Sequence, residues 1–237
     1  MLPGRCLVCQ AVADIPCLDL CERCLTGWPF LSLEPFGTSD PGGTSDRGLR
    51  EGTTFAPFAF ATPIDAALRE LKYRADWRWA AVLGAVVAAS ALVATQQPEA
   101  LRLPDLFVPV PLHAERRRDR GFNQASKLAN ALGRHLAIPV WEHALHRPRA
   151  TAAQTGLSAA ARHDNVRDAF SLTAGVEKKL LAMLKNREPL RIALVDDVLT
   201  TGATLDAAAT PLRGLGGVEL QRWAIARTIP TSTTSPT

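Results

Sequence analysis

Two acidic residues and a hydroxyl-rich turn follow an apolar segment near the C-terminal end of the chain. Residues 192–195 are expected to form a buried strand, after which come Asp196 and Asp197. An expected helix then begins with Thr200, Thr201, Gly202, Ala203 and Thr204. Helix N-termini bind anions, glycine permits close approach, and neighbouring carboxylates can bond ribose hydroxyls or help to hold a divalent metal. The pattern predicts a sugar-phosphate site, and the number of polar groups in this order argues against a capped helix that binds nothing.

A second polar segment follows another expected strand, at residues 106–110. Pro111 makes the turn after this strand rigid, His113 follows, and a helix is expected to begin near Asn123 and Gln124. The segment between them carries four arginines: Arg116, Arg117, Arg118 and Arg120. Guanidinium groups bond phosphate oxygens in pairs, so this basic loop is expected to face a pyrophosphate or a nucleic-acid backbone. Arg120 is the better candidate for such a contact, whereas Arg117 and Arg118 fit a solvated surface equally well.

All five cysteines lie near the N-terminus, and four of them form two Cys-x-x-Cys pairs. The pairs are Cys6 with Cys9 and Cys21 with Cys24, which predicts a tetrahedral structural Zn²⁺ site. Cys17 could replace Cys21 as a ligand, although Cys21 matches the spacing of the first pair better. A disulfide framework fits poorly with an odd number of cysteines and no export signal.

Alternating strands and helices are expected to position these groups. Strands are predicted at residues 55–61, 106–110, 168–172, 191–195 and 218–226, and helices at 64–73, 77–94, 122–136 and 204–215. This order predicts an α/β fold with a doubly wound, mainly parallel sheet. Ligands of such sheets bind beyond the carboxyl ends of the strands, where both polar segments begin.

Composition and patterning divide the chain into four parts. Residues 1–36 form the cysteine segment, 37–54 a flexible linker rich in turn formers, 55–229 the main domain and 230–237 a disordered tail. The net charge of +4 permits phosphate or nucleic-acid partners without requiring them. The apolar run at 79–94 is too short to span a membrane and is expected to be a buried core helix, so the expected compartment is the cytoplasm.

Several motifs in one order resemble a known family. Residues 192–204 resemble the signature of type I phosphoribosyltransferases, which bind phosphoribosyl pyrophosphate (PRPP). Together with residues 109–113, 120–124 and 165–170 and the cysteine pairs, they resemble the ComF family, also called ComFC or GntX-like proteins. The Leu-Lys-Tyr element of that family matches residues 71–73, and its Gln and Arg match Gln154 and Arg162. The resemblance extends from residue 6 to about residue 228.

The resemblance implies a phosphoribosyltransferase-like domain behind a zinc-ribbon-like segment. Residues 200–204 would hold the 5-phosphate of PRPP, Asp196 and Asp197 would act as catalytic residues at the ribose, and Mg²⁺ would bridge ribose and pyrophosphate oxygens. If the strand stays regular through Asp197, only one carboxylate can reach the sugar, because adjacent residues point to opposite faces. The candidate contacts for pyrophosphate or DNA are Lys72, Val110, Pro111, His113, Arg116, Arg120, Asn123 and Gln124.

Three functions are compatible with the resemblance. The first is a PRPP-binding protein linked to competence and to the uptake of single-stranded DNA, alongside a helicase partner. The second is an active transferase for an unidentified base or amine; Thr200 stands where purine-type enzymes carry an acid/base Asp, which argues against a 6-oxopurine. The third is a DNA-binding or helicase-binding module with a vestigial pocket, for which the chain has few aromatic residues to stack on bases (6%).

Overall fold

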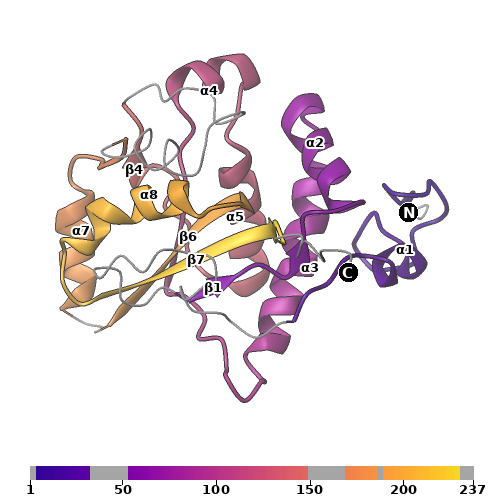
Figure 1. Ribbon diagram of the computed structural model, residues 1–237, viewed down its shortest axis with the longest axis horizontal. Helices are drawn as coiled ribbons and strands as arrows, with labels where there is room; N and C mark the ends of the chain where they lie inside the picture. The colour runs from indigo at the N-terminus through magenta and orange to yellow at the C-terminus, as the bar shows by residue number, and fades with distance from the viewer. Residues whose placement is uncertain (1–3, 33–52, 149–168, 186–188, 230–237) are drawn as a thin grey trace, which may run out of the picture.

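The computed structural model describes residues 4–32, 53–148, 169–185 and 189–229 (Figure 1). Most of the expected linker, the tail and the family positions from residue 154 to residue 168 lie outside these ranges. Thr54, the last residue of the expected linker, already belongs to the first strand.

The central sheet is parallel throughout its described pairings. It contains β1 (Thr54–Phe55), β2 (Phe58–Ala59), β3 (Leu106–Pro109), β6 (Leu190–Leu199) and β7 (Val218–Arg227). The order is β1-β7-β6-β3, and β2 also pairs with β7. In the register, Pro109 of β3 stands beside Val195 of β6, so the two polar segments begin at neighbouring points of one sheet edge. The predicted mixed α/β fold with a mostly parallel sheet is confirmed.

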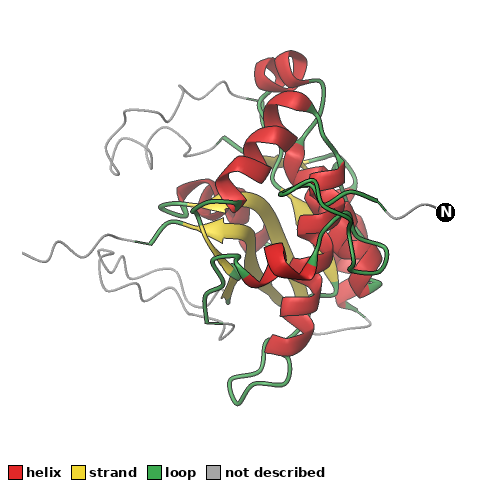
Figure 2. Ribbon diagram, turned by 90° about the vertical axis from the view of Figure 1, so that its right-hand side faces the viewer, coloured by secondary structure: helices red, strands yellow, loops and turns green. Residues whose placement is uncertain are grey.

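Helices cover both faces of this sheet (Figure 2). On one face lie α2 (Ile64–Arg74), α3 (Arg78–Ala94) and α5 (Gln124–Leu136). On the other lie α7 (Val176–Leu184) and α8 (Ala203–Arg213). The alternation of β6 explains the division, because Ala193 and Val195 join the core of the first face while Ile192 and Leu194 join the core of the second.

The alanine-rich helix α3 is a core helix, as predicted. Its residues Val82, Leu83 and Ala91 are almost completely buried, and α3 crosses α5 so closely that a Cβ on Gly84 would collide with Ala131. Among the described residues, no helix combines the length and the apolar character needed to cross a bilayer.

Three local predictions are wrong. The strand expected at 55–61 is interrupted, since Pro57, which has no N–H group, separates β1 from β2. The strand expected at 168–172 is limited, among the described residues, to β5 (Ser171–Leu172), which pairs antiparallel with β4 (Leu145–His146) outside the main sheet. The expected basic loop is a helix, α4 (Ala114–Arg120), because its arginines and Glu115 are good helix formers and His113 caps its first turn.

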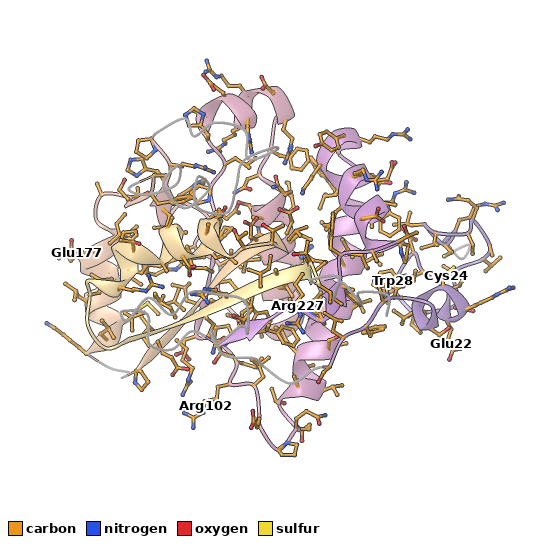
Figure 3. The ribbon with its side chains drawn as sticks, in the orientation of Figure 1. Glu22, Cys24, Trp28, Arg102, Glu177 and Arg227 are labelled. Atoms are coloured by element: carbon orange, nitrogen blue, oxygen red, sulfur yellow. The ribbon has the colours of Figure 1, made fainter. Side chains whose placement is uncertain are left out.

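The N-terminal cysteine segment packs directly on the main domain. Leu20 and Trp28 belong to the same apolar cluster as Phe58, and the Trp28 and Phe58 rings meet edge to face with centroids 5.3 Å apart. Figure 3 shows Trp28 beside Cys24, whose short helix α1 (Glu22–Thr26) precedes it. The conformation of the cysteine segment therefore depends on its packing against the core of the main domain.

Candidate functional site

A cavity of about 690 Å³ opens beyond the carboxyl ends of β3 and β6. Residues from four parts of the chain line it, and Figure 1 shows two of these parts, α2 and α4, on the same side of the sheet. The predicted site residues among its walls are Lys72, Val110, Pro111, Arg116, Arg120, Gln124, Asp196, Asp197, Thr200 and Thr204. The fold thus brings both polar segments into one pocket.

Asp197 is the anchored member of the acidic pair. Its carboxylate is buried and forms an ion pair with Lys72 from α2, while Gln124 Nε2 of α5 lies 3.4 Å from its Oδ1. Arg120 Nη1 donates in turn to Gln124 Oε1 at 2.5 Å. Burial acts to raise the pKa of Asp197, but the charge and hydrogen bonds of Lys72 outweigh it and lower the pKa below its ordinary value. Asp197 is therefore charged at neutral pH and is the structural partner of Lys72.

Asp196 has a different environment. Its Oδ1 accepts the N–H of Asp197 at 2.8 Å, and the side chain is half-buried. Burial, followed by the charge of Asp197, raises its pKa well above the ordinary value. Because β6 stays regular through both residues, Asp197 faces α2 and α5 while Asp196 lies on the opposite side. The inference that only one carboxylate addresses a sugar stays a prediction, and the geometry makes Asp196 the less committed of the two.

The threonine-rich turn lies between β6 and α8. Gly202 adopts φ 78°, a left-handed conformation that favours glycine, and α8 starts at the next residue. Thr201 Oγ1 accepts the N–H of Ala203 at 3.4 Å. Thr200 and Thr204 line the cavity, whereas the three residues between them do not. The turn thus presents hydroxyls and the N-terminus of an eleven-residue helix on the cavity side.

Because α4 is a helix, only some of its arginines reach the cavity. Arg116 and Arg120 are one turn apart and both line the cavity, whereas Arg117 and Arg118 are exposed and do not. His113, just before α4, accepts the N–H of Glu115 through Nδ1 at 3.3 Å and caps the helix. His113 is not among the residues that line the cavity. Its expected contact with phosphate stays a prediction.

Asn123 has a positioning role in the structure. Its Oδ1 accepts the N–H of Ala125 at 3.1 Å and so caps α5, while Nδ2 donates to the carbonyl of Val110 at 3.0 Å. Asn123 does not line the cavity itself. These two hydrogen bonds link the end of β3 to the start of α5, the helix that carries Gln124. They therefore hold two lining segments of the cavity in a fixed relative position.

Sequence reasoning missed several residues of the pocket wall. Arg147, just after β4, lines the cavity, and its guanidinium lies over the Phe170 ring at 5.1 Å. Burial and the nearby Arg116 lower the pKa of Arg147, whereas the charge of Asp196 raises it. Tyr73, Asp119 and Phe122 also line the cavity. Their positions in the known motifs were a signal for Tyr73 and Phe122, but no motif marks Arg147.

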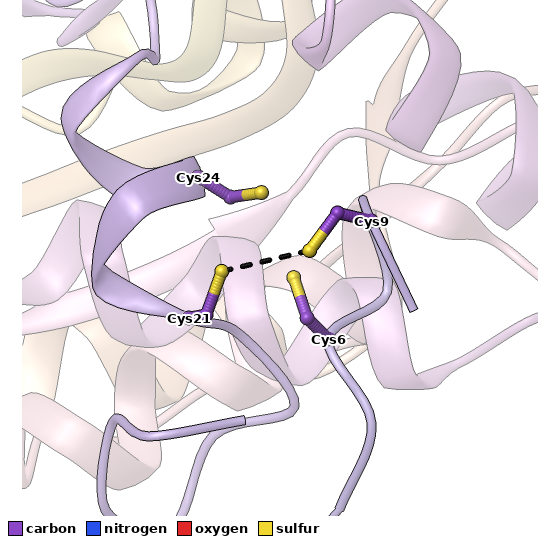
Figure 4. A group of neighbouring side chains, drawn as sticks. All are labelled: Cys6, Cys9, Cys21 and Cys24. Atoms are coloured by element: carbon purple, nitrogen blue, oxygen red, sulfur yellow. Dashed lines mark hydrogen bonds between the residues drawn. The ribbon is translucent and has the colours of Figure 1, made fainter. Parts of the chain in front are cut away.

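Four cysteines converge at the N-terminus (Figure 4). The Sγ atoms of Cys6, Cys9, Cys21 and Cys24 all lie within 4.8 Å of one another, and those of Cys9 and Cys21 are 3.7 Å apart. Cys17 is exposed and is not part of the group. Burial acts to raise the pKa of Cys6, but backbone N–H groups outweigh it and lower the pKa to about 6, which favours the thiolate. The group is able to hold a metal ion, with the ligands that the spacing predicted.

The chain is similar in sequence to several known proteins. No protein-family model matches the chain. Competence protein F of Haemophilus influenzae is 44% identical over 128 residues, which cover 54% of this chain and 52% of that protein, so this match spans about half of either protein. DNA utilization protein YhgH of Escherichia coli O157:H7 is 33% identical over 227 residues, which cover 95% of this chain and 91% of that protein. YhgH of Salmonella typhimurium has 33% identity over 226 residues, with the same coverage. The chain therefore belongs to the ComF family.

Proposed function

We propose that this protein binds PRPP together with Mg²⁺ in the cavity at the carboxyl ends of β3 and β6. One observation carries the proposal: acidic, hydroxyl and guanidinium groups from separate segments converge on a single cavity of about 690 Å³. A bare phosphate site would need only the helix N-terminus. The acidic pair beside it favours a ligand that also carries ribose hydroxyls.

Each part of the cavity suits one part of PRPP. Residues 200–204 would receive the 5-phosphate at the start of α8, and Asp196 would accept hydrogen bonds from the ribose hydroxyls. Arg116 and Arg120 would face the pyrophosphate, since both line the cavity from α4. Lys72 would hold Asp197 rather than the ligand. Mg²⁺ would supply charge neutralisation at the pyrophosphate, as it binds few protein groups and keeps several waters.

We also propose a structural Zn²⁺ at the four-cysteine group and a role in DNA handling. Four thiolates in a compact group suit tetrahedral Zn²⁺. The relatives carry the names Competence protein F and DNA utilization protein, which support a role linked to competence and to DNA. Single-stranded DNA and a helicase as partners are what the resemblance to the ComF family implies.

Calorimetry with PRPP and Mg²⁺ tests the binding proposal. The variant Asp196→Asn removes the carboxylate assigned to the ribose at nearly constant volume and leaves the ion pair of Asp197 with Lys72 intact. Loss of charge-assisted hydrogen bonds worth about 2–3 kcal/mol is expected to lower the affinity about 30- to 150-fold. Glu177→Gln is the matched control, because Glu177 is exposed on α7 (Figure 3) and does not line the cavity. Equal PRPP affinity in Asp196→Asn and the wild type would refute the proposal.

Turnover is a separate question. Thr200 lines the cavity at the position where purine-type enzymes carry an acid/base Asp. At this position the chain therefore has no side chain that could exchange a proton with a purine ring. Incubation with PRPP and a panel of nucleobases and amines, followed by measurement of released pyrophosphate, separates an active transferase from a binding protein. Release above the rate without acceptor would identify a transferase, and none across the panel would favour binding alone.

The exposed arginines favour DNA binding as a second candidate function. Arg117 and Arg118 are exposed and do not line the cavity, so they are accessible to a phosphate backbone. The variant Arg117→Gln/Arg118→Gln is expected to weaken single-strand binding and to reduce its dependence on salt. An affinity for single-stranded DNA that does not fall as salt is added would argue against phosphate contacts.

A further inference from the structure

One wall of the cavity is aromatic and open to solvent. Tyr73, the only tyrosine of the chain, lines the cavity and is 75% exposed. Phe122 also lines the cavity, is half-buried and packs against the core, and the Trp77 ring, 54% exposed, meets it edge to face at 6.3 Å. The exposed surface of Tyr73 and Trp77 contributes little to the core. Exposed rings beside a polar cavity are characteristic of a ligand surface.

Cations lie against two of these rings. The guanidinium of Arg120 is 5.5 Å from the centroid of Tyr73, and Lys127 Nζ is 4.1 Å from that of Trp77. Arg120 is held in turn by Gln124, which reaches Asp197. The aromatic wall is thus connected to the acidic pair through an unbroken series of polar contacts.

The junction between α2 and α3 presents the rings rigidly. Ala75 ends α2 in a left-handed conformation, φ 52°, and Asp76 then accepts two hydrogen bonds from the Arg78 guanidinium, at 2.9 and 2.7 Å. Lys72 points inward to Asp197, so its neighbour Tyr73 is directed to the rim. A strained, braced junction of this kind holds exposed side chains in place at a binding site.

We propose that Tyr73, with Phe122 and Arg120, forms a subsite that stacks a planar heteroaromatic ring, a nucleobase, beside the ribose-phosphate site. Every nucleobase offers a π-face to an aromatic or guanidinium plane, and stacking tolerates any sequence. Asp119, which also lines the cavity, supplies an acceptor for a ring N–H. The inference rests on the proposed function only where it places a ribose phosphate beside the base. The stacking of the base on Tyr73 does not depend on PRPP binding. The base comes either from a free nucleoside or base, or from a single strand of DNA.

The single tyrosine permits a direct test. Protein that carries 3-fluorotyrosine has one ¹⁹F resonance, at residue 73, which a stacked base shifts through its ring current. Adenosine, thymidine and a short oligothymidylate are titrated, and ribose 5-phosphate serves as the ligand without a base. A saturable shift with base-bearing ligands, larger than that with ribose 5-phosphate, supports the subsite. Saturation by nucleosides identifies a free base as the source, and saturation by the oligonucleotide alone identifies the strand. No shift with any base-bearing ligand would overturn the inference.

Variants separate this subsite from the PRPP site. Calorimetry with the same ligands measures base affinity in the variants, because a protein changed at residue 73 carries no tyrosine. Tyr73→Ala is expected to weaken base binding about 5- to 150-fold, and Tyr73→Phe to retain most of it. Phe60→Ala, which changes an exposed aromatic outside the cavity, should leave base binding unchanged. PRPP affinity, measured by calorimetry on the same variants, should stay unchanged. Equal loss of PRPP and base affinity in Tyr73→Ala would mean that Tyr73 shapes the pocket, and the inference would fail. A base-induced shift in a protein that does not bind PRPP would refute the proposed function and leave the subsite supported.

Discussion

Replacement of Lys72 by methionine should expose how much the ion pair with Asp197 contributes. The carboxylate of Asp197 is buried and the Lys72 side chain is only 21% exposed, so water replaces the lost ammonium poorly. Removal of one partner from a buried pair costs roughly 3 kcal/mol or more, because the remaining charge is uncompensated. In a domain of this size such a loss lowers Tm by about 6–12 °C.

The pH dependence of this loss distinguishes electrostatics from packing. In the wild type the folded-state pKa of Asp197 is depressed, so the ion pair stabilises the fold above the unfolded pKa of about 4, and this is lost as pH falls through the folded value. In Lys72→Met the charge and hydrogen bonds of Lys72 are absent, and burial, the largest effect on Asp197, raises that pKa. The variant should therefore be least stable relative to wild type at pH 7, and the difference should shrink towards pH 4.

Urea denaturation of four proteins at pH 7 and pH 5 measures the effect. Lys178→Met, an exposed lysine of α7, is the matched control and should change the free energy of unfolding by less than about 0.5 kcal/mol. Asp197→Asn in the Lys72→Met background should recover much of the stability, because no buried charge remains. A pH-independent loss, or no recovery in the double variant, would refute the electrostatic reasoning.

Three further predictions concern the pocket, the metal group and the core. Because burial raises the pKa of Asp196, its ionised form opposes folding. Asp196→Asn should therefore raise the free energy of unfolding at pH 7, a gain that vanishes below pH 4 in urea denaturation. Elemental analysis should find Zn²⁺ in the wild type, and chelation or Cys9→Ser should remove it and lower Tm, whereas Cys17→Ser should retain the metal and the Tm. A metal-free wild type with an unchanged Tm would contradict this. Gly84→Ala should destabilise the fold by about 1–3 kcal/mol through overpacking against α5, whereas Gly214→Ala, with open space at its Cβ, should be nearly neutral in thermal denaturation.

Local pattern was sufficient for the elements and for the choice of ligands in the cysteine group. The helices at 64–73 and 77–94 and the strands at 106–110 and 191–195 were predicted to within a few residues, because apolar periodicity reflects burial. The spacing of two Cys-x-x-Cys pairs selected the four thiols that the fold brings together and left out Cys17. The prediction failed for the strand at 55–61 and for the arginine segment, where Pro57 and the cap at His113 decided the local structure.

By itself, the amino-acid sequence determined the type of fold, the two polar segments at strand ends and the group of four cysteines, since each depends on periodicity or spacing over a short stretch. Only the tertiary structure decided that Asp196 and Asp197 have opposite pKa shifts, because Lys72 and Gln124 come from helices far away in the chain. It also decided which arginines face the cavity and brought Arg147 and the exposed ring of Tyr73 to its walls. Charge, burial and stacking are properties of neighbours in space, and no spacing along the chain records them.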